Sequence, residues 1–422
     1  MGYRVLIAAV ACEPRSGSES FFGWSAIQSL REMVEIEVIT TENNRGALEK
    51  EAAERPLGFR VHYLGKKKTW HPNRMLARAQ SWLGTINFSR QVLTIAQKIH
   101  AEQPFDLVHH VTISTWRVAS PLWRLGIPFV WGPIGGGEAF PWECRSLLSP
   151  QAQIFEAARE LSNITGRLSP RIQATAQNAA FCLAANEETK KVLLDLRGQK
   201  AGVQVMSPAM FWPERMKSLQ TGVLSKPAAQ PLRIFAGGNL EGRKGVAIAL
   251  QALAIARNKG VDFVFRLGGY GPERTHLQNL ARELGLEDRV IFGDSLSGED
   301  YLNELHKSHL YLLPSLREHT GLTLLEAMLA GCVPIVANGG GPGSIVAENR
   351  GFKIAVSHPA KMAAEIAEVI CLLARDPGLR EKLGIEASRF VATEYSAKNY
   401  QDRMAEIYRK ALAGEANEMR SA

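Results

Sequence analysis

Residues 311–346, YLLPSLREHTGLTLLEAMLAGCVPIVANGGGPGSIV, constrain the fold of this chain more than any other stretch. Residues 310–313 form a short apolar run that ends before a proline, which is typical of a buried parallel strand. Residues 321–330 have the pattern of a helix that ends at a glycine, and residues 333–337 form the next apolar run. The loop of residues 315–320 is therefore expected at the carboxyl end of a parallel sheet, where open α/β sheets bind their ligands.

The start of the predicted helix offers a site for an anion. Thr320 is a suitable N-cap residue. The backbone N–H groups of Gly321, Leu322 and Thr323 would then point toward the loop. Together with the helix dipole, these donors suit a phosphate group.

Two glutamates accompany this anion site, Glu318 in the loop and Glu326 in the helix. Carboxylates accept hydrogen bonds from paired hydroxyl groups such as those of a ribose or a hexose. The alternative is that both are solvated surface residues, as most glutamates are. Because Glu326 lies in an apolar segment, however, it needs a partner. Phosphate donors beside hydroxyl acceptors predict a pocket for a nucleotide sugar.

The same segment resembles a known family. Residues 318–337, EHTGLTLLEAMLAGCVPIVA, are similar to the E-x7-E segment of the retaining GT-B glycosyltransferases of family four, the glycosyl transferases group 1. His319 and Thr320 stand where the family usually has Gly-Phe, and Ser344 stands where a Glu often follows the G-G-x-x element. The resemblance implies a GT-B architecture, in which two Rossmann-like α/β domains face a cleft.

Composition limits the other classes of function. The 422 residues carry a net charge of +8, which allows acidic ligands or an anionic membrane surface without specifying nucleic acid. The five cysteines are widely spaced and odd in number, as expected for reduced thiols, and they lack metal-ligand spacing. No stretch approaches the roughly 20 apolar residues of a membrane span. We expect a cytoplasmic protein and interpret residues 5–12 as a first strand rather than a signal sequence.

The order of the predicted elements divides the chain into two α/β domains and a linker. The linker is placed where the sequence becomes rich in proline and loses its periodicity. The resemblance implies that the last helix crosses back to the first domain. The expected boundaries are an N-terminal Rossmann-like acceptor-side domain at 1–206, a linker at 207–231, a C-terminal Rossmann-like nucleotide-sugar donor domain at 232–395 and the terminal helix at 396–413.

In the first domain, candidate residues follow two predicted strands. Gly17 lies in the loop after residues 4–10, and this loop resembles the G-G-x-E loop of the family. His109 and His110 lie near the end of the strand at 105–111, in a region that resembles the D-x-x-H strand lining the family's reaction centre. Adjacent strand residues point to opposite faces, so at most one histidine enters a cleft. We favour His110, and the alternative is that both are core residues.

A further loop of the first domain follows residues 128–131 and contains Gly136, Gly137 and Glu138. Consecutive glycines allow a ligand to approach the backbone closely. The family often has a glycine-rich loop here that faces the cleft. We therefore place these three residues on the acceptor side.

The second domain supplies basic residues in the loop after residues 232–236. Arg243 and Lys244 can neutralise a diphosphate, although an exposed basic pair is the alternative. Lys244 matches the lysine of a family motif whose arginine falls on Asn239, so Arg243 is a candidate replacement for the missing charge. Gly271 lies in a turn that resembles the family's G-x-G-P turn near the nucleotide.

These residues are assigned roles by the resemblance. His110, His109 and Glu318 are the catalytic candidates. The leaving nucleoside diphosphate would be held without a metal, and the nucleotide sugar would be a co-substrate rather than a cofactor. The donor-binding set is Gly17, Asn239, Arg243, Lys244, Gly271, Glu318, Thr320, Gly321, Leu322, Thr323 and Glu326.

The function implied is transfer of a sugar, with retention, from a nucleoside-diphosphate sugar to a hydroxyl group of a glycan, glycolipid or glycoside. Two alternatives stay open, a nucleotide-sugar epimerase of similar fold and a non-catalytic nucleotide-sugar binding protein. Residues 65–100 are basic and amphipathic, so they either pack on the sheet or contact the inner face of a membrane. The second interpretation fits a lipid-linked acceptor.

Overall fold

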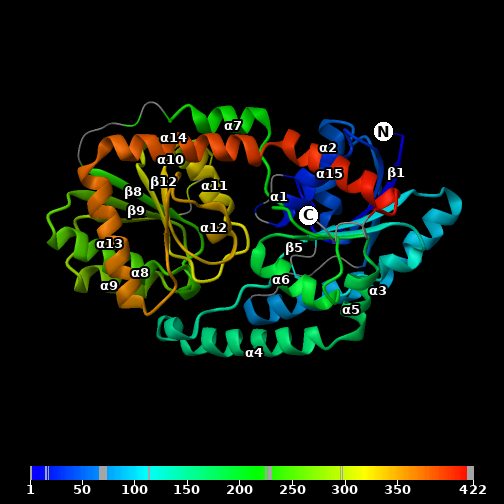
Figure 1. Cartoon of the computed structure of the whole chain (residues 1–422), viewed down its shortest axis with the longest axis horizontal. Helices are drawn as coiled ribbons and strands as arrows, with labels where there is room; N and C mark the ends of the chain where they lie inside the picture. Colours follow the sequence, from blue (N-terminus) through cyan, green and yellow to red (C-terminus); the bar gives the residue numbers. More distant parts are fainter. Residues whose placement is uncertain are drawn as a thin grey trace. The chain divides into compact units, whose positions relative to one another are not determined.

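The structure is a computed structural model that describes residues 2–14, 17, 19–65, 74–112, 115–223, 226, 231–294, 296 and 298–415, without the side chains of 74–82. The chain forms two compact units (Figure 1). Unit 1 consists of Met1–Gly137, Leu161–Met210 and Ala397–Ala422, and unit 2 consists of Glu138–Glu160 and Phe211–Ser396. Each unit has its own parallel sheet with helices between successive strands, so the predicted fold of two Rossmann-like α/β domains is confirmed.

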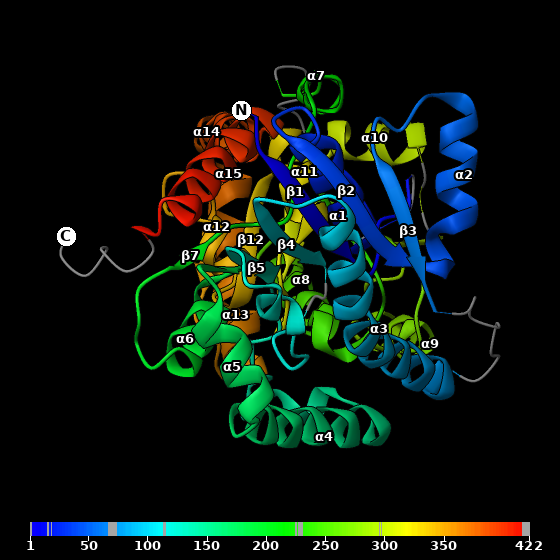
Figure 2. The same ribbon diagram turned by 90° about the vertical axis from the view of Figure 1, so that its right-hand side faces the viewer.

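The sheet of unit 1 is parallel throughout and has the order β3-β2-β1-β4-β5-β6-β7 (Figure 2). Its central strands are buried along their whole length, which explains why they are continuous apolar runs in the sequence. The strands are β1 (Arg4–Ala9), β2 (Glu35–Thr41), β3 (Arg60–Leu64), β4 (Leu107–Thr112), β5 (Phe129–Ile134), β6 (Phe181–Ala184) and β7 (Val203–Val205).

Helices connect these strands, and the C-terminal helix joins the same unit by packing against α1. The basic segment at 65–100 falls largely in α3, which contacts β2 and β3, whereas residues 66–73 and the side chains of 74–82 lie outside the described part. The helices of unit 1 are α1 (Glu19–Leu30), α2 (Arg45–Glu54), α3 (Arg74–Glu102), α5 (Pro170–Asn178), α6 (Glu187–Leu196) and α15 (Ala397–Leu412).

The sheet of unit 2 is also parallel and has the order β10-β9-β8-β11-β12-β13. The chain builds outward from β8 to β10 and then returns to add β11 on the other side of β8. The order of strands therefore reverses between β8 and β11. The strands are β8 (Leu232–Gly237), β9 (Phe263–Gly268), β10 (Val290–Gly293), β11 (Leu310–Leu313), β12 (Val333–Ala337) and β13 (Phe352–Ile354).

The helices of unit 2 form two groups that pack within themselves. One group contains α8 (Val246–Asn258), α9 (Arg274–Glu283) and α13 (Pro359–Arg375). The other contains α7 (Pro213–Gln220), α10 (Gly298–Lys307), α11 (Leu322–Leu329) and α14 (Pro377–Glu394). The short helix α12 (Gly340–Ile345) follows β12. Crossovers that leave a parallel sheet in two directions produce this double layering.

The predicted linker at 207–231 contains a helix. The second piece of unit 1 ends at Met210, and α7 belongs to unit 2, where it contacts α10 and α11. Pro213 is at the first position of α7, where its missing N–H costs nothing. The proline content that marked this stretch as a linker is in part the start signal of a helix.

Segment Glu138–Glu160 belongs to unit 2, although the sequence places it within the first domain at 1–206. Phe140, Cys144 and Leu148 are buried in the same hydrophobic core as strands β8 and β9. The segment contains the first part of helix α4 (Pro150–Arg167), whose remaining residues belong to unit 1. These apolar side chains gain burial only by joining the core of unit 2.

Among the helices of the described residues, none is long and apolar enough to cross a membrane. The five cysteines are free and buried. Burial raises the pKa of the Cys182 thiol to about 11 despite the nearby Arg197. These thiols are therefore protonated and unreactive at neutral pH.

Candidate functional site

The candidate site lies at the carboxyl ends of β8 and β11. These strands are neighbours in the sheet of unit 2, and the strand order reverses between them. Loops that leave adjacent strands at such a point diverge and expose a ligand site between them. The loop after β8 contains Arg243 and Lys244, and the loop after β11 contains Glu318, so the topology brings these three predicted residues together.

Backbone contacts hold the two loops against each other. The amide of Leu316 donates to the carbonyl of Arg243 over 2.8 Å. Gly245 has a φ of 67°, and a Cβ atom there would lie 2.1 Å from the carbonyl oxygen of Pro314. Only glycine satisfies both conditions. The positions of the charged side chains therefore follow from contacts that the backbone makes.

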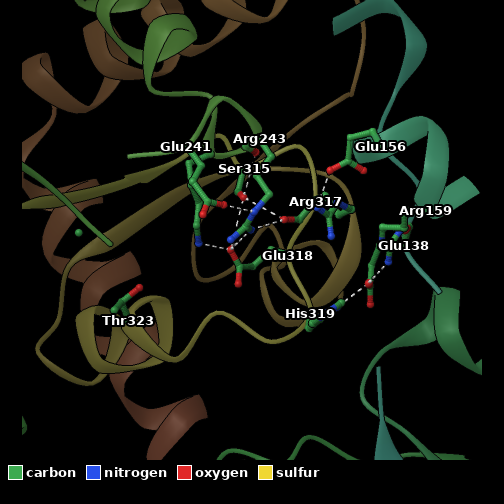
Figure 3. A network of polar contacts seen from close by, with 12 residues as sticks. Glu138, Glu156, Arg159, Glu241, Arg243, Ser315, Arg317, Glu318, His319 and Thr323 are labelled. Atoms are coloured by element: carbon green, nitrogen blue, oxygen red, sulfur yellow. Dashed lines mark hydrogen bonds and ion pairs between the residues drawn. The ribbon is translucent and has the colours of Figure 1, made fainter. Parts of the chain in front are cut away.

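Glu318 is the acidic centre of a cluster of charges (Figure 3). Its carboxylate pairs with the ammonium of Lys244 and lies 3.8 Å from Arg243 Nη1. Arg243 Nε also donates to Glu241 over 2.7 Å. Burial opposes ionisation of Glu318, but the charges of Lys244 and Arg243 outweigh it and lower the pKa of the carboxyl group. Glu318 is therefore ionised at neutral pH.

The glycine turn after β8 packs against the turn after β9. A Cβ atom at Gly271 would lie 2.3 Å from the carbonyl oxygen of Leu240, and one at Gly269 would lie 2.0 Å from that of Gly238. Gly271 is required here for close packing of two turns. Asn239 is exposed, and its carbonyl accepts a hydrogen bond from the amide of Glu241. The donor-binding roles assigned to Asn239 and Gly271 stay predictions.

The predicted N-cap of the next helix is wrong. Helix α11 begins at Leu322, and its N-cap is Gly321, which has a left-handed backbone with a φ of 79°. Thr320 is buried and does not cap the helix. Glycine is accepted at an N-cap and adopts this backbone without strain, so the helix starts one residue later than the threonine suggests.

The first turn of α11 still presents donors at the predicted place. The first amide groups of any helix have no acceptor within it, and in α11 they belong to Leu322 and Thr323 at its start. The hydroxyl of Thr323 accepts a hydrogen bond of 2.7 Å from buried Tyr311, whose pKa is raised by burial. The expected anion site therefore has its helix terminus, shifted by one residue.

Glu326 has the partners that its apolar surroundings require. Arg215 Nη2 donates to Oε1 over 2.7 Å, and the Tyr301 hydroxyl donates to Oε2 over 3.0 Å. Burial raises the pKa of Tyr301 well above its usual value, and the carboxylate of Glu326 adds to this effect. Arg215 comes from α7, within the stretch expected to be a linker. The ribose-binding role of Glu326 stays a prediction.

Both candidate histidines lie in the core of unit 1. His109 Nδ1 lies 2.7 Å from the Tyr408 hydroxyl, and its Nε2 lies 2.6 Å from the carbonyl of Gly132. His110 Nδ1 lies 2.9 Å from Ser120 Oγ. Burial lowers the pKa of His109 to about 4 and that of His110 to about 3. The geometry shows neutral core histidines, and their catalytic assignment stays a prediction.

The glycines expected on the acceptor side are held by contacts within unit 1. The carbonyl of Gly136 accepts hydrogen bonds of 3.0 Å from Trp116 Nε1 and from Arg117 Nη1. The amide of Gly137 donates to Thr189 Oγ1 over 3.1 Å. Gly17 is exposed, and both of its neighbours lie outside the described residues.

Glu138 belongs to unit 2 and not to the acceptor-side unit in which it was expected. Its buried carboxylate lies 2.5 Å from His319 Nδ1 and 3.8 Å from Arg159 Nη2. Glycines before Glu138 suggested a flexible ligand loop. The sequence feature that could have placed Glu138 in unit 2 is the set of apolar residues that follow it, because they join the core of unit 2.

Within the described residues, no three His, Cys, Asp or Glu side chains are grouped so that they could hold a metal ion. The charge available for a phosphate at this site is that of Lys244, Arg243 and the start of α11.

Residues 224–390, which contain the whole cluster, match the model of the family Glycosyl transferases group 1. This part of the chain is a glycosyl transferases group 1 domain. The predicted family is thereby confirmed for the unit in which the sequence resemblance was found.

Two curated relatives of this chain come from Streptomyces kanamyceticus. An alpha-D-kanosaminyltransferase is 31% identical over 181 residues, which cover 43% of this chain and 46% of that protein. A 2-deoxystreptamine glucosyltransferase is 25% identical over 338 residues, which cover 74% of this chain and 82% of that protein. The chain thus matches about half of the first relative and most of the second, and the predicted enzyme class, a glycosyltransferase, agrees with both names.

A solved structure shares the fold across both units. HepE of Anabaena, in complex with UDP-glucose, aligns with a TM-score of 0.59 at 16% identity and covers 96% of this chain and 98% of its own. At this identity the likeness concerns the fold alone, and it agrees with the predicted GT-B architecture.

Proposed function

We propose that the protein is a retaining glycosyltransferase that moves a sugar from a nucleoside-diphosphate sugar to a hydroxyl group of a glycan, glycolipid or glycoside acceptor. The observation that carries the proposal is the cluster of Lys244, Arg243 and Glu318 beside the start of α11, at the reversal point of the sheet. The names of the relatives and the UDP-glucose bound to HepE support it.

The cluster offers complementary groups for the two parts of such a donor. Lys244, Arg243 and the amides that begin α11 suit the diphosphate. When the diphosphate binds the two cations, the carboxylate of Glu318 loses part of its pairing and accepts hydrogen bonds from sugar hydroxyls. Glu326, on the same helix, is proposed for the ribose hydroxyls.

The same cations serve the chemical step. As the bond between the anomeric carbon and the phosphate oxygen breaks, negative charge develops on the leaving diphosphate. Lys244, Arg243 and the dipole of α11 are placed to stabilise that charge. We therefore expect activity without a divalent metal, and added EDTA should leave the rate unchanged.

Retention is proposed to follow a same-face route. A double displacement needs a carboxylate at the anomeric carbon. Glu318 is assigned to the sugar hydroxyls, and Glu241 of the same cluster pairs with Arg243. In the same-face route the acceptor oxygen bonds to the anomeric carbon on the side that the phosphate leaves, and the acceptor proton passes to a phosphate oxygen. This route needs no nucleophile from the protein.

For a glycolipid acceptor, the proposal includes a cytoplasmic enzyme in peripheral contact with the membrane through residues 65–100. The basic character of that segment supports this part. Vesicles of anionic lipid should then raise the rate with a lipid-linked acceptor and leave the rate with a soluble acceptor unchanged.

A donor screen tests the function. Purified protein is incubated with UDP-, GDP- and ADP-sugars in EDTA, with and without an extract of candidate acceptors, and the release of nucleoside diphosphate is followed. Acceptor-dependent release from one donor supports the proposal. Interconversion of sugars without an acceptor would instead indicate an epimerase, and saturable binding without release would indicate a binding protein.

A further inference from the structure

The loop of residues 315–320 carries charged or titratable side chains that point in two directions (Figure 3). Glu318 faces Lys244 and Arg243. The residues on either side of it, Arg317 and His319, face away from this cluster and toward segment Glu138–Glu160. We call residues 315–320 the donor loop. Its side chains contact the candidate site on one side and, on the other, a segment that is far away in the sequence.

Two acidic side chains of that segment form the attachments. Arg317 Nη2 donates to Glu156 Oε1 over 2.6 Å. His319 Nδ1 lies 2.5 Å from Glu138 Oε2. Arg159, from the same helix as Glu156, adds a hydrogen bond of 2.6 Å to the carbonyl of Glu138. Both neighbours of Glu318 thus have a carboxylate partner in one segment.

These pairs are buried deeply enough to restrict the loop. The side chains of Glu138 and Glu156 are 1% and 6% exposed, and that of Arg317 is 11% exposed. A buried carboxylate without its partner is costly, so each pair favours the one loop geometry in which it forms. The side chain of His319 is more open, at 38% exposed.

The backbone of the loop is confined at the same point. The amide of Gly341 donates to the carbonyl of Glu318 over 3.0 Å. A Cβ atom at Gly340 would lie 2.0 Å from that carbonyl oxygen and 3.4 Å from Cγ of Glu138. Glu138 therefore lies where the donor loop meets the glycine turn after β12, and a change in its position is transmitted to the backbone of Glu318.

We propose that Glu138 and Glu156 are positioning residues of the donor site, which act through His319 and Arg317 to aim the carboxylate of Glu318 at the sugar. The proposal rests on the proposed function, since it assigns Glu318 to the sugar and the cations to the diphosphate. It gives segment Glu138–Glu160 a role in donor recognition rather than in acceptor binding.

The proposal predicts different effects on the affinity for a free nucleoside diphosphate and on the affinity for a nucleotide sugar. Release of one attachment lets the side chain of Glu318 turn, which weakens contacts with the sugar. The contacts of the diphosphate with Lys244 and α11 are retained. Glu138→Gln and Glu156→Gln should therefore weaken binding of a nucleotide sugar about fivefold to thirtyfold, the factor expected for one or two lost polar interactions, and weaken the free nucleoside diphosphate less than twofold.

Calorimetric titration of the full chain measures this difference. UDP, GDP and ADP and their glucose conjugates are titrated into wild type, Glu138→Gln and Glu156→Gln. Glu160→Gln is the matched control, because Glu160 lies in the same segment and pairs with Arg145 over 3.0 Å rather than with the donor loop. The control should bind both kinds of probe as wild type does.

The outcomes separate the two proposals. If wild type binds none of the probes, the proposed function fails. If wild type binds but the variants lose affinity equally for nucleotide and nucleotide sugar, or lose no more than Glu160→Gln, the positioning role is overturned while the proposed function stands.

A second set of variants tests whether a loss of affinity comes from the lost contact or from misfolding. Arg317→Gln and His319→Gln change the loop ends of the same attachments and should show the same selective loss. The double variant Glu156→Gln/Arg317→Gln should lose no more than either single variant, because the two side chains act as one pair. Additive losses would contradict the proposal.

Discussion

Glu318 pairs with Lys244, one of the two cations that are proposed to bind the diphosphate. The pair is mostly buried, with side-chain exposures of 15% and 17%, and its charges are little screened by water. The residue that pairs with these cations is therefore also the one proposed to recognise the sugar.

Lys244→Ala removes a charge-assisted contact to the diphosphate. We expect donor affinity to fall by about 10- to 100-fold, which corresponds to about 1.5–3 kcal/mol for a hydrogen bond to a charged group. The kcat should fall as well, because the same charge stabilises the leaving diphosphate. Steady-state kinetics with the donor found in the screen provide the measurement.

Lys259→Ala is the control for this change. Lys259 forms an exposed pair with Glu368 in the same unit, away from the loops after β8 and β11. It should leave KM and kcat unchanged, since exposed pairs contribute little. Equal effects of the two substitutions would contradict the assigned role of Lys244.

At this scale the sequence identifies residues better than it identifies contacts. Glu318, Lys244 and Glu326 were each predicted from their neighbours in the chain. Their contacts with Glu138, Glu156 and Arg215 or with the loop beside them were not predicted, because these partners lie from about 100 to 180 residues away. Glu138 was itself a candidate residue, but it was expected on the acceptor side. The cap at Gly321 was missed because threonine and glycine have similar preferences for the N-cap position, so that the backbone geometry decides between them.

At the scale of elements, helix α7 follows the point at which the chain passes from unit 1 to unit 2, and it contacts helix α11. Arg215 of α7 reaches Glu326 of α11, and Tyr301 of α10 reaches the same carboxylate. The side chain of Glu326 thus links helices α7, α10 and α11. The buried strands were predictable because continuous apolar runs have few other solutions. Helix α7 was not, because its eight residues are mostly polar and begin with a proline.

Arg215→Ala should destabilise unit 2 by about 1 kcal/mol, which is below the usual range of about 1.5–3 kcal/mol for a hydrogen bond to a charged group because the Arg215 side chain is 38% exposed. Urea unfolding followed by circular dichroism measures the change.

Lys217→Ala removes the same charge from an exposed position of α7 and serves as the control. Its midpoint should stay within error of wild type. A loss of stability equal to that of Arg215→Ala would mean that the net charge of α7, and not the contact with Glu326, holds the helix in place.

At the scale of the whole molecule, unit 1 keeps two neutral histidines in its core. In the native state, burial lowers the pKa of His109 to about 4 and that of His110 to about 3. In the unfolded chain both have the ordinary pKa of 6.5. The unfolded state therefore binds more protons between these values. The contribution to stability is fully present above pH 6.5 and is lost as the pH falls toward 4.

The free energy of unfolding should decrease by about 1.4 kcal/mol per pH unit for each histidine as the pH falls from 6 to 5. Tryptophan fluorescence is a suitable probe, because six of the eight tryptophans belong to unit 1. His109→Gln and His110→Gln should each reduce the slope by about one proton. His276→Gln, at an exposed position, should not alter it. An unchanged slope in both core variants would contradict their neutral state.

The path of the chain has a practical consequence for recombination. It passes between the units at 137/138, 160/161, 210/211 and 396/397. A gene chimera that borrows unit 1 from another enzyme must therefore import three separate pieces and leave codons 138–160 with the host. A single crossover in the apparent linker would instead transplant Glu138 and Glu156 with the graft, and the resident Arg317 and His319 would meet side chains selected against another loop. The four positions at which the chain passes between the units therefore decide which parts can be exchanged.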